Sequence, residues 1–451
     1  MALRRVLVAN RGEIAVRVVR ACHSLGIEAV VAVSTADRDG MAARLADRAV
    51  CIGGPRVGES YLNQQALLAA ALGTGCEAVH PGYGFLAENA SFSDACAAEG
   101  LTFVGPPGDI IRAMGNKLAA RDLAAEAGVP IVPGSPHIAR VEDAEEQAER
   151  IGYPLLTKAA AGGGGRGIRV VRGPDELASS FQSASAEAEA AFGDGTVYLE
   201  RYVERGRHIE VQVLADHHGN VIHLGDRDCS MQRRYQKIIE EAPAALIRPD
   251  VQEELRSAAV GLARRIGYRN AGTVEFIYDE DREEFFFLEM NTRIQVEHPV
   301  TEEVTGVDLV QWQLRIAGGE VLDLAQEDVR FDGHAIECRV TAESAPHGFR
   351  PSPGRVARWE RPATSGVRLD SHMEAGAVIP PFYDSLLGKL IVHGVDRDDA
   401  VQRTLEALRA FDVDGVETTL PFLDRLVDSD AFRSGAFHTR WVEGNLDALI
   451  A

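Results

Sequence analysis

The stretch FLEMNTRIQVEHPV, at residues 287–300, has a polar residue at every second position from 289 to 297. These residues are Glu289, Asn291, Arg293, Gln295 and Glu297, and the residues between them are mostly apolar. Alternate side chains of an extended chain share a face, so the pattern predicts a strand with one ionic face and one buried face. A row of carboxylates and amides with a guanidinium indicates a site for charged ligands.

A predicted hairpin precedes this row. Its strands are TVEFIYD (273–279) and EFFFLEM (284–290), and a turn centred on residue 282 would place Glu275 directly opposite Glu289. Like charges in that position are destabilising. A divalent cation bound by both carboxylates and by the amide oxygen of Asn291 would neutralise them, and Mg²⁺ favours such ligands together with substrate phosphates. A solvated acidic hairpin is the alternative. Large apolar residues favour a packed sheet instead, and they are Val274, Phe276, Phe285 and Phe287.

A glycine-rich segment, GGGGRG at residues 162–167, lies between two predicted strands. It matches GxGxxG formally, but a strand follows it and not a helix, so the match does not indicate a dinucleotide site. The GK[ST] of a Walker A loop is absent. The segment instead predicts a hairpin tip whose backbone amides close over phosphates, with Lys158 just before it reaching one of them. A tip that binds nothing is the alternative.

The chain has only four lysines, which leaves 43 of its 47 basic residues as arginine. They are Lys117, Lys158, Lys237 and Lys389. Lysine supplies a compact point charge that arginine cannot replace at a tight site. We therefore expect the lysines at functional positions, with chance survival as the alternative.

Two further stretches carry polar side chains that are expected to converge on the same region. HIEVQV (208–213) places His208, Glu210 and Gln212 on one strand face. DCSMQRRYQKIIEEAP (228–243) contains Arg233, Arg234 and Lys237. Each residue alone is more typical of a solvated or core position. Together with the acidic hairpin and the glycine loop they predict a phosphate site beside a cation.

The elements that must position these groups follow an α/β pattern in the first hundred residues. Strands are predicted at 6–10 and 27–33, a helix at 11–25, and a further strand with a glycine-rich turn within 75–89. A β-rich stretch over 208–300 contains a helical pattern at 251–267. From about 330 the pattern is again β, and a helix is predicted at 398–411. A parallel α/β domain followed by β-rich domains is expected.

Composition excludes several classes of protein. A chain of 451 residues is too long for one core. Its net charge of −21 argues against nucleic acid or an anionic membrane as a general partner, and no apolar run reaches the roughly 20 residues of a membrane span. The start lacks the apolar region of a secretory signal. The six cysteines are scattered without a CxxC, which is typical of reduced thiols, so a cytoplasmic location is expected.

Several long motifs resemble those of the biotin carboxylases, the ATP-grasp components of biotin-dependent carboxylases. The resemblance covers about residues 3–445. It rests on ANRGEIA (9–15), HPGYGFLAEN (80–89), MGNK (114–117), KAAAGGGGRGIRVV (158–171), RHIEVQVLAD (207–216), RDCSMQRR (227–234), FLEMNTRIQVEHPVTE (287–302), ECRV (337–340) and PPFYDSLLGKL (380–390).

The resemblance implies an α/β and α+β multidomain fold. A Rossmann-like domain, called pre-ATP-grasp in this family, would occupy residues 1–114. An ATP-grasp domain would occupy 115–330, with a mobile glycine-rich lid at about 130–203. A β-rich biotin carboxylase C-terminal domain would occupy 331–451. The family uses MgATP to convert bicarbonate to carboxyphosphate, which breaks down to CO₂ and phosphate. The phosphate deprotonates the ureido nitrogen of biotin, which then captures CO₂.

The same resemblance implies roles for individual residues. Glu297 would be the base that deprotonates bicarbonate, and Arg339 would stabilise the biotin enolate. Bicarbonate would be bound by Lys237, Arg293 and the backbone of Val296. ATP would be bound by Lys117, Lys158, Gly164, Gly165, Glu200 and His208, with residue 235 near the ribose. Two Mg²⁺ or Mn²⁺ ions would be held by Glu275, Glu289 and Asn291.

The implied partners are a biotin carboxyl carrier protein, carboxyltransferase subunits and a second copy of the chain. No Met-Lys dipeptide of a biotin attachment site occurs in the sequence, so biotin is expected on a separate carrier. The final acceptor is left open among acetyl-CoA, propionyl-CoA and pyruvate, although an acyl-CoA is the acceptor that we expect. Neither the dimer interface nor a role for Lys389 follows from the sequence.

Two positions depart from the family pattern. Tyr235 stands where a histidine is usual, and Ala161 stands where the glycine loop usually begins. A phenol can form a hydrogen bond but cannot become a cation. Two alternative functions therefore remain at this point. One is an ATP-grasp ligase with another acceptor, and the other is a non-catalytic nucleotide-binding paralogue that regulates a carboxylase complex.

Overall fold

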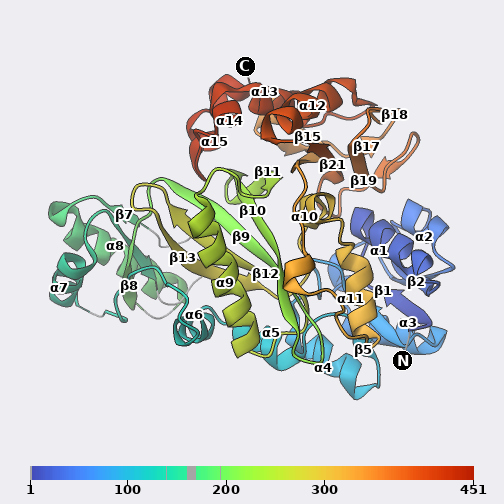
Figure 1. Ribbon diagram of the computed structural model, residues 1–451, viewed down its shortest axis with the longest axis horizontal. Helices are drawn as coiled ribbons and strands as arrows, with labels where there is room; N and C mark the ends of the chain where they lie inside the picture. The colour runs from blue at the N-terminus through green and yellow to red at the C-terminus, as the bar shows by residue number, and fades with distance from the viewer. Residues whose placement is uncertain (1–2, 139, 160–168, 193–194, 451) are drawn as a thin grey trace. The chain divides into compact units, whose positions relative to one another are not determined.

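The computed structural model describes residues 3–138, 140–159, 169–192 and 195–450. Figure 1 labels its helices and strands. The chain divides into two compact units. The first comprises Met1–Gly128, His208–Glu275 and Glu289–Ala451, and the second comprises Val129–Arg207 and Phe276–Leu288. The lid predicted at about 130–203 lies within the second unit. The boundaries predicted at 114/115 and 330/331 both fall inside the first unit, and they stay predictions.

A parallel five-stranded sheet forms the N-terminal part of the first unit, as the α/β pattern predicted. Its order is β3-β2-β1-β4-β5. The strands are β1 (Arg5–Val8), β2 (Glu28–Ser34), β3 (Arg48–Gly53), β4 (Ala78–His80) and β5 (Thr102–Phe103). The helices that accompany it are α1 (Gly12–Ser24), α2 (Met41–Leu45), α3 (Gln64–Thr74), α4 (Ala90–Ala98), α5 (Gly108–Gly115) and α6 (Lys117–Glu126), with the 3₁₀ turn η1 (Val57–Glu59).

The two faces of this sheet pack in different hydrophobic cores. Alternate side chains of a strand point to opposite faces. Val6 and Val8 of β1 pack in a core that includes residues of α1, whereas Leu7 packs in a second core that includes residues of α3 and α4. The near-continuous apolar composition of β1 and β2 is typical of a parallel sheet that is covered on both faces.

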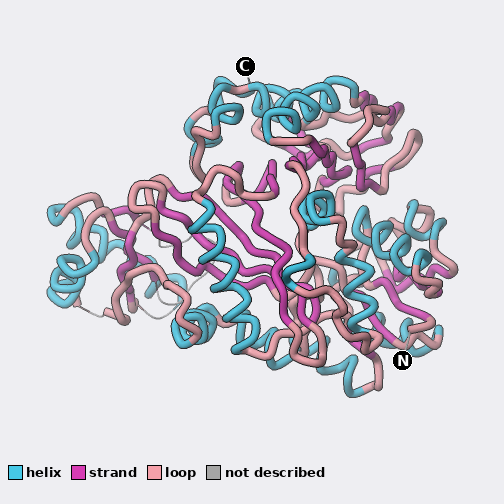
Figure 2. Tube along the Cα trace, in the orientation of Figure 1, coloured by secondary structure: helices cyan, strands magenta, loops and turns pink. Residues whose placement is uncertain are grey.

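An eight-stranded sheet has the order β13-β12-β9-β10-β11-β14-β21-β19 (Figure 2). The predicted site residues on its strands are His208, Lys237, Glu275, Glu289, Asn291 and Arg339. Its strands are β9 (Gly206–Ala215), β10 (Val221–Arg233), β11 (Gln236–Ala242), β12 (Asn270–Asp279), β13 (Glu284–Asn291), β14 (His334–Thr341), β19 (Val367–Ser371) and β21 (Leu386–Gly394). The predicted hairpin at 273–290 is confirmed, since β12 and β13 are neighbours. Because β11 pairs with β14, the sheet continues across residue 330, where a domain boundary is predicted.

The helix predicted at 251–267 is α9 (Pro249–Arg265), and the helix predicted at 398–411 is α12 (Arg397–Ala410). Two further helices follow the hairpin, α10 (His298–Thr305) and α11 (Leu309–Ala317). The C-terminal part adds α13 (Leu420–Asp428), α14 (Asp430–Ser434), α15 (Trp441–Gly444), α16 (Leu446–Ile450) and the turns η2 (Gln326–Asp328) and η3 (Ala345–His347). Its short strands are β15 (Glu343–Ser344), β16 (Arg350–Pro351), β17 (Gly354–Arg355), β18 (Arg358–Glu360), β20 (Val378–Ile379) and β22 (Asp412–Asp414).

The second unit contains a sheet of order β7-β6-β8 together with the helices α7 (Val141–Ile151) and α8 (Pro174–Phe192). Its strands are β6 (Leu155–Ala159), β7 (Arg169–Val171) and β8 (Val197–Arg201). The antiparallel pairing of β6 with β7 confirms the strand–loop–strand prediction. The glycine loop between them lies outside the described residues, and with it Ala161, Gly164 and Gly165.

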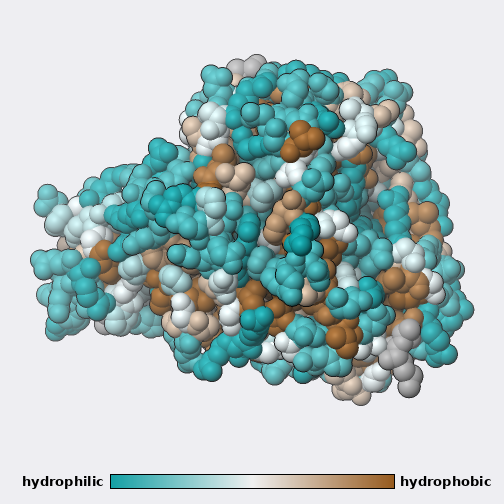
Figure 3. Space-filling view, viewed as in Figure 1, coloured by the Kyte–Doolittle hydropathy of each residue, from teal (hydrophilic) through white to brown (hydrophobic). Residues whose placement is uncertain are grey.

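The face of the molecule seen in Figure 3 is mostly hydrophilic, with apolar residues scattered over it. Among the described residues, no helix is both long and apolar enough to span a bilayer.

Candidate active site

The ammonium group of Lys237 lies at the centre of a buried cluster of carboxylates in the first unit. Its Nζ is 2.5 Å from Glu210 Oε2, 2.9 Å from Glu275 Oε1 and 2.5 Å from Glu297 Oε1. The three carboxylates come from β9, from β12 and from the turn before α10. Burial lowers the pKa of Lys237, but the three glutamates outweigh burial and raise it well above its ordinary value. The predicted anion-binding lysine is therefore a cation.

Glu297 is held between two cations. Its Oε1 contacts Lys237, and its Oε2 is 3.0 Å from Nη2 of Arg339 on β14. The side chain is completely buried. Burial raises the pKa of its carboxyl, but Lys237 and Arg339 bring it below the ordinary value of glutamate. Glu297 is thus an ionised carboxylate beside the cations that would bind a small anion, which is the arrangement expected of a base for bicarbonate.

Two arginines support this cluster from the sheet. Arg227 on β10 donates from Nε to Glu210 Oε1 at 2.5 Å and from Nη1 to Gln212 Oε1 at 2.9 Å. Its two partners lie on the same face of β9, as the alternation in HIEVQV predicted. Arg339 donates from Nε to Glu240 Oε1 at 2.5 Å. Arg227 thus holds one of the carboxylates that contact Lys237, and Arg339 contacts another of them, Glu297.

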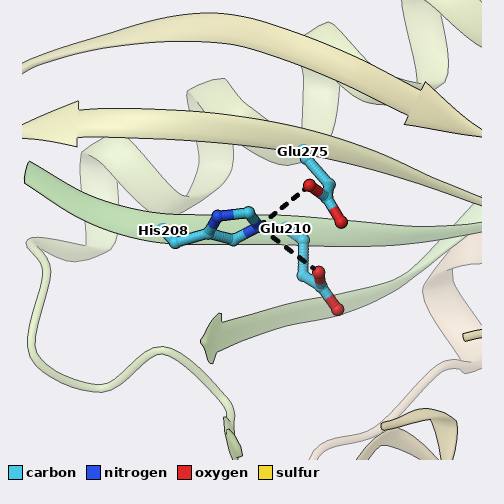
Figure 4. A group of neighbouring side chains, drawn as sticks. All are labelled: His208, Glu210 and Glu275. Carbon is cyan, nitrogen blue, oxygen red and sulfur yellow. Dashed lines mark ion pairs between the residues drawn. The ribbon is translucent and has the colours of Figure 1, made fainter. Parts of the chain in front are cut away.

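His208 lies beside the carboxylates on β9 and β12 (Figure 4). Its Nε2 is 3.1 Å from Glu275 Oε2 and 3.7 Å from Glu210 Oε2. Burial lowers the pKa of His208, but the Glu275 charge outweighs burial and raises the pKa to about 9. Three such residues are close enough to ligate a metal. A protonated imidazole cannot ligate a metal ion, because both of its ring nitrogens carry protons, so His208 is not assigned as a ligand.

The segment after Asn291 is not the extended strand that the alternation predicts. β13 ends at Asn291, the chain bends at 292–293, and α10 begins at His298. The expectation of one strand over 289–297 is therefore wrong beyond Asn291. Pro299 in the first turn of α10 gives the physical reason, because proline favours a helix start and cannot donate to a β ladder.

The polar side chains of this segment nevertheless gather. Arg293 donates to Asn291 Oδ1 and Gln295 Oε1, each at 3.0 Å, and its Nε donates to Glu88 Oε2 at 2.9 Å. Gln295 Nε2 lies 3.3 Å from Glu275 Oε1. The bend thus replaces the flat row of side chains by a cluster around Arg293.

The predicted metal ligands fit a divalent cation by their chemistry. Glu275 and Glu289 lie on the neighbouring strands β12 and β13. Glu289 keeps part of its surface in solvent, yet the protein around its carboxyl and the charge of Glu275 raise its pKa. Asn291 Nδ2 donates to Glu275 Oε1 at 2.9 Å. The Asn291 amide oxygen accepts from Arg293. Two carboxylates of like charge and an amide supply the hard oxygen donors that Mg²⁺ or Mn²⁺ prefers.

The remaining residues predicted to bind the nucleotide belong to both units. In the second unit, the Lys158 ammonium donates to the Glu200 carboxylate, across the neighbouring strands β6 and β8. In the first unit, Lys117 is exposed at the start of α6, next to its N-cap Asn116.

Of the cations in MQRRYQK, Lys237 joins the cluster, whereas Arg233 lies 3.7 Å over the ring of Phe349. The expected convergence of the arginines of this stretch is therefore wrong for Arg233. Residues 234 and 235 form the two-residue turn between β10 and β11, and both have positive φ, 49° and 63°. Tyr235 is 88% exposed. This departure from the family pattern thus falls on a hairpin tip and not on the buried cluster.

Three residues of the cluster, whose partners are far away in the chain, were not predicted from the sequence. Glu88 contacts Arg293, Arg227 contacts Glu210, and Glu240 contacts Arg339. Arg227 lies in the motif RDCSMQRR and Glu240 in IIEEAP. A charged residue within a predicted strand could have marked each of them as a candidate site residue. Their partners follow only from strand pairing.

Three family models match the chain. They are described as the N-terminal domain of biotin carboxylase, over residues 2–111, the ATP-binding domain of the carbamoyl-phosphate synthase L chain, over 116–325, and the C-terminal domain of biotin carboxylase, over 337–444.

Similar proteins match over nearly their whole length. Biotin carboxylase 1 of Bacillus subtilis is 51% identical over 442 residues, which are 98% of each chain. A pyruvate carboxylase subunit from Methanothermobacter thermautotrophicus is 50% identical over 97% of this chain and 89% of its own. The biotin carboxylase domain dimer of Hydrogenobacter thermophilus 2-oxoglutarate carboxylase, solved with MgADP, ADP and bicarbonate, has a TM-score of 0.90 at 48% identity. That match covers 100% of this chain and 99% of that one.

Proposed function

This chain belongs to the biotin carboxylase family, and on that premise we propose that the buried carboxylate of Glu297 starts its reaction. The protein is an ATP-dependent ligase that carboxylates biotin with bicarbonate. The assignment of Glu297 is supported chiefly by its two contacts, at 2.5 Å to Lys237 and 3.0 Å to Arg339.

In the first step Glu297 takes the hydroxyl proton of bicarbonate. Lys237 and Arg293 neutralise the anion, and the backbone N–H of Val296 donates to it. An oxygen of the deprotonated anion attacks the γ-phosphorus of ATP, the bond to ADP breaks, and carboxyphosphate forms. Positioning and charge neutralisation supply most of the rate enhancement in phosphoryl transfer.

Nucleotide binding is assigned to Lys117, Lys158, Glu200, His208 and the loop containing Gly164 and Gly165. Glu275, Glu289 and Asn291 would hold two Mg²⁺ or Mn²⁺ ions. Such ions neutralise the phosphates at which the bond breaks. The donor chemistry of these three side chains, set out above, supports their assignment.

Biotin is acted on in the second step. Carboxyphosphate gives CO₂ and phosphate, the phosphate removes the ureido N–H proton of biotin, and the guanidinium of Arg339 stabilises the resulting enolate before CO₂ is captured. Arg339 also contacts Glu297. The same guanidinium therefore serves both the deprotonation of bicarbonate and the carboxylation of biotin. Biotin arrives on a carboxyl carrier protein, and the carboxylated carrier then serves a carboxyltransferase.

The assembly is proposed to contain a dimer of this chain in the cytoplasm. Components of a biotin carboxylase, a pyruvate carboxylase and a 2-oxoglutarate carboxylase are 51%, 50% and 49% identical to the chain. These identities are too close to indicate which acceptor the chain serves. We therefore infer that the carboxyltransferase, and not this chain, selects the acceptor. An acyl-CoA is the acceptor that we propose.

ADP release from the purified chain tests this function. It is expected to require bicarbonate and Mg²⁺ together and to form carboxybiotin from free biotin. Bicarbonate-independent turnover, or a preference for another carboxylate or amine, would indicate a different ATP-grasp ligase. Nucleotide binding without any turnover would indicate a regulatory paralogue.

Tyr235→His is expected to change the KM for ATP modestly and kcat little. A neutral hydrogen bond from residue 235 to the ribose is worth about 0.5–1.5 kcal/mol, so its loss changes KM by roughly tenfold at most. Tyr235→Phe, which removes only the hydroxyl, is the matched control. Steady-state kinetics with free biotin measure KM for ATP and kcat in the wild type and in both variants. An inactive wild type that Tyr235→His restores would identify a disabled paralogue.

A further inference from the structure

Lys389 is a fully buried lysine on β21 that the proposed reaction does not use. Its Nζ donates to the backbone carbonyl of Val296 at 2.8 Å and is 3.1 Å from Glu13 Oε1. Glu13 lies in α1, is itself buried, and accepts a hydrogen bond from the hydroxyl of Tyr83. An ammonium group with no exposed surface is thus fixed between an ion pair and the segment that carries the proposed bicarbonate site.

The sheet register shows why Lys389 reaches this segment. Arg339 on β14 lies directly opposite Lys389 on β21, which in turn lies opposite Asp370 on β19. These residues share one face, and the opposite face packs with α12 and α13 through residues such as Cys338 and Leu390. On the polar face Arg339 bonds the side chain of Glu297 while Lys389 bonds the backbone just before it.

Burial of this ammonium is costly, and it is compensated locally. Burial lowers the pKa of Lys389, but Glu13, Glu337 and Asp370 outweigh burial and keep the pKa raised. A buried ion pair is a weak source of stability compared with well-packed apolar residues of similar volume. Stability alone therefore gives little reason for a lysine at this position, and the hydrogen bond to Val296 is its distinctive feature.

The Val296 carbonyl belongs to the same planar peptide unit as the Glu297 nitrogen. Fixing that carbonyl fixes the plane of the peptide that precedes the Glu297 Cα, which restricts the directions in which the Glu297 side chain can leave the backbone. The chain needs such support here, since residues 296–297 form a turn between the end of β13 and the start of α10. The peptide lies outside both elements, so its orientation is not set by the interior of a strand or a helix.

We propose that Lys389 is a positioning residue that holds the Val296–Glu297 peptide so that the Glu297 carboxylate and the Val296 N–H meet bicarbonate. The inference rests on the proposed roles of those two residues. Lys389 touches neither substrate nor reacting atom and acts through the backbone that it bonds.

The test is the double variant Lys389→Met/Glu13→Gln. Lys389→Met alone would leave the Glu13 carboxylate buried without its cation, which can prevent folding. The double variant removes both charges together, and the glutamine keeps an oxygen for the Tyr83 hydroxyl. Displacement of reacting groups by about 1 Å can cost roughly 100-fold in rate. We therefore expect kcat/KM for bicarbonate to fall by about 10- to 100-fold, while calorimetry gives an ATP affinity within about twofold of wild type.

A matched control comes from a buried pair in the same unit. Arg397 Nε is 2.7 Å from Glu241 Oε2, and neither residue has a place in the proposed reaction. Arg397→Met/Glu241→Gln is expected to lower the melting temperature but to leave kcat/KM for bicarbonate within about twofold. A purely structural role for Lys389 would make the two double variants behave alike.

Wild-type bicarbonate kinetics in the Lys389→Met/Glu13→Gln variant would overturn the inference. Equal losses of ATP affinity and bicarbonate kinetics, together with a lowered melting temperature, would also overturn it. The proposed function has a separate readout, because it fails if the wild-type chain shows no bicarbonate-dependent ATP cleavage.

Discussion

Glu297→Gln is expected to lower bicarbonate-dependent ATP cleavage by about 10²–10⁴-fold, the usual contribution of a general base. Glutamine keeps the size of the side chain and an oxygen for Lys237 or Arg339, but it cannot accept the bicarbonate proton. Nucleotide binding should persist, because Glu297 contacts the anion-binding cations and not the proposed nucleotide lysines. ADP release with saturating bicarbonate, and calorimetry with ATP, measure the two effects separately.

Glu240→Gln is the matched control for loss of charge. Glu240 is equally buried and contacts the same arginine, with its Oε1 2.5 Å from Arg339. Burial raises the pKa of Glu240 to about 7, so both variants are assayed above that pH, where the wild-type residue is ionised. A much smaller rate loss is expected, because this variant leaves the base in place. Equal losses in the two variants would mean that Glu297 acts through charge alone. Loss of ATP affinity in the Glu297 variant, with its fold intact, would move Glu297 into the nucleotide site.

Glu289→Gln is expected to reduce MgATP turnover by roughly 100-fold or more, because one anionic metal ligand is lost and metal ions supply several kcal/mol in phosphoryl transfer. Stability should change little or rise slightly. Glu289 is partly exposed, and both its surroundings and the charge of Glu275 raise its pKa, which means that its ionised form is disfavoured in the folded protein. Thermal melts and turnover at increasing Mg²⁺ concentrations separate the two effects.

Glu254→Gln, on the exposed side of α9, controls for the loss of one surface carboxylate. Glu275→Gln should also lose turnover, but its stability should fall, since Glu275 neutralises Lys237 and His208. The two glutamates look equivalent in the sequence, and their different partners in the structure make them unequal. If Glu289→Gln turns over MgATP at the wild-type rate, the metal assignment is wrong.

The sequence by itself determined the local elements and the types of residue in the site. The β1–α1–β2 pattern, the hairpin at 273–290 and helix α9 follow from periodicity, because each is decided by neighbours in the chain. The alternation in HIEVQV placed Glu210 and Gln212 on one face, and both bond Arg227. The lysine count marked Lys389 as a residue of interest without assigning it a role.

Only the tertiary structure decided how these groups meet. Lys237 bridges carboxylates from β9, from β12 and from the turn before α10, which lie far apart in the chain. The chain bends between the end of β13 at Asn291 and the start of α10 at His298. The alternation of side chains along a strand therefore does not extend to Glu297. Lys389 reaches Val296 because β14, β21 and β19 pair in one register. Pairing between distant strands depends on packing of the whole sheet, and for that reason local sequence patterns do not contain it.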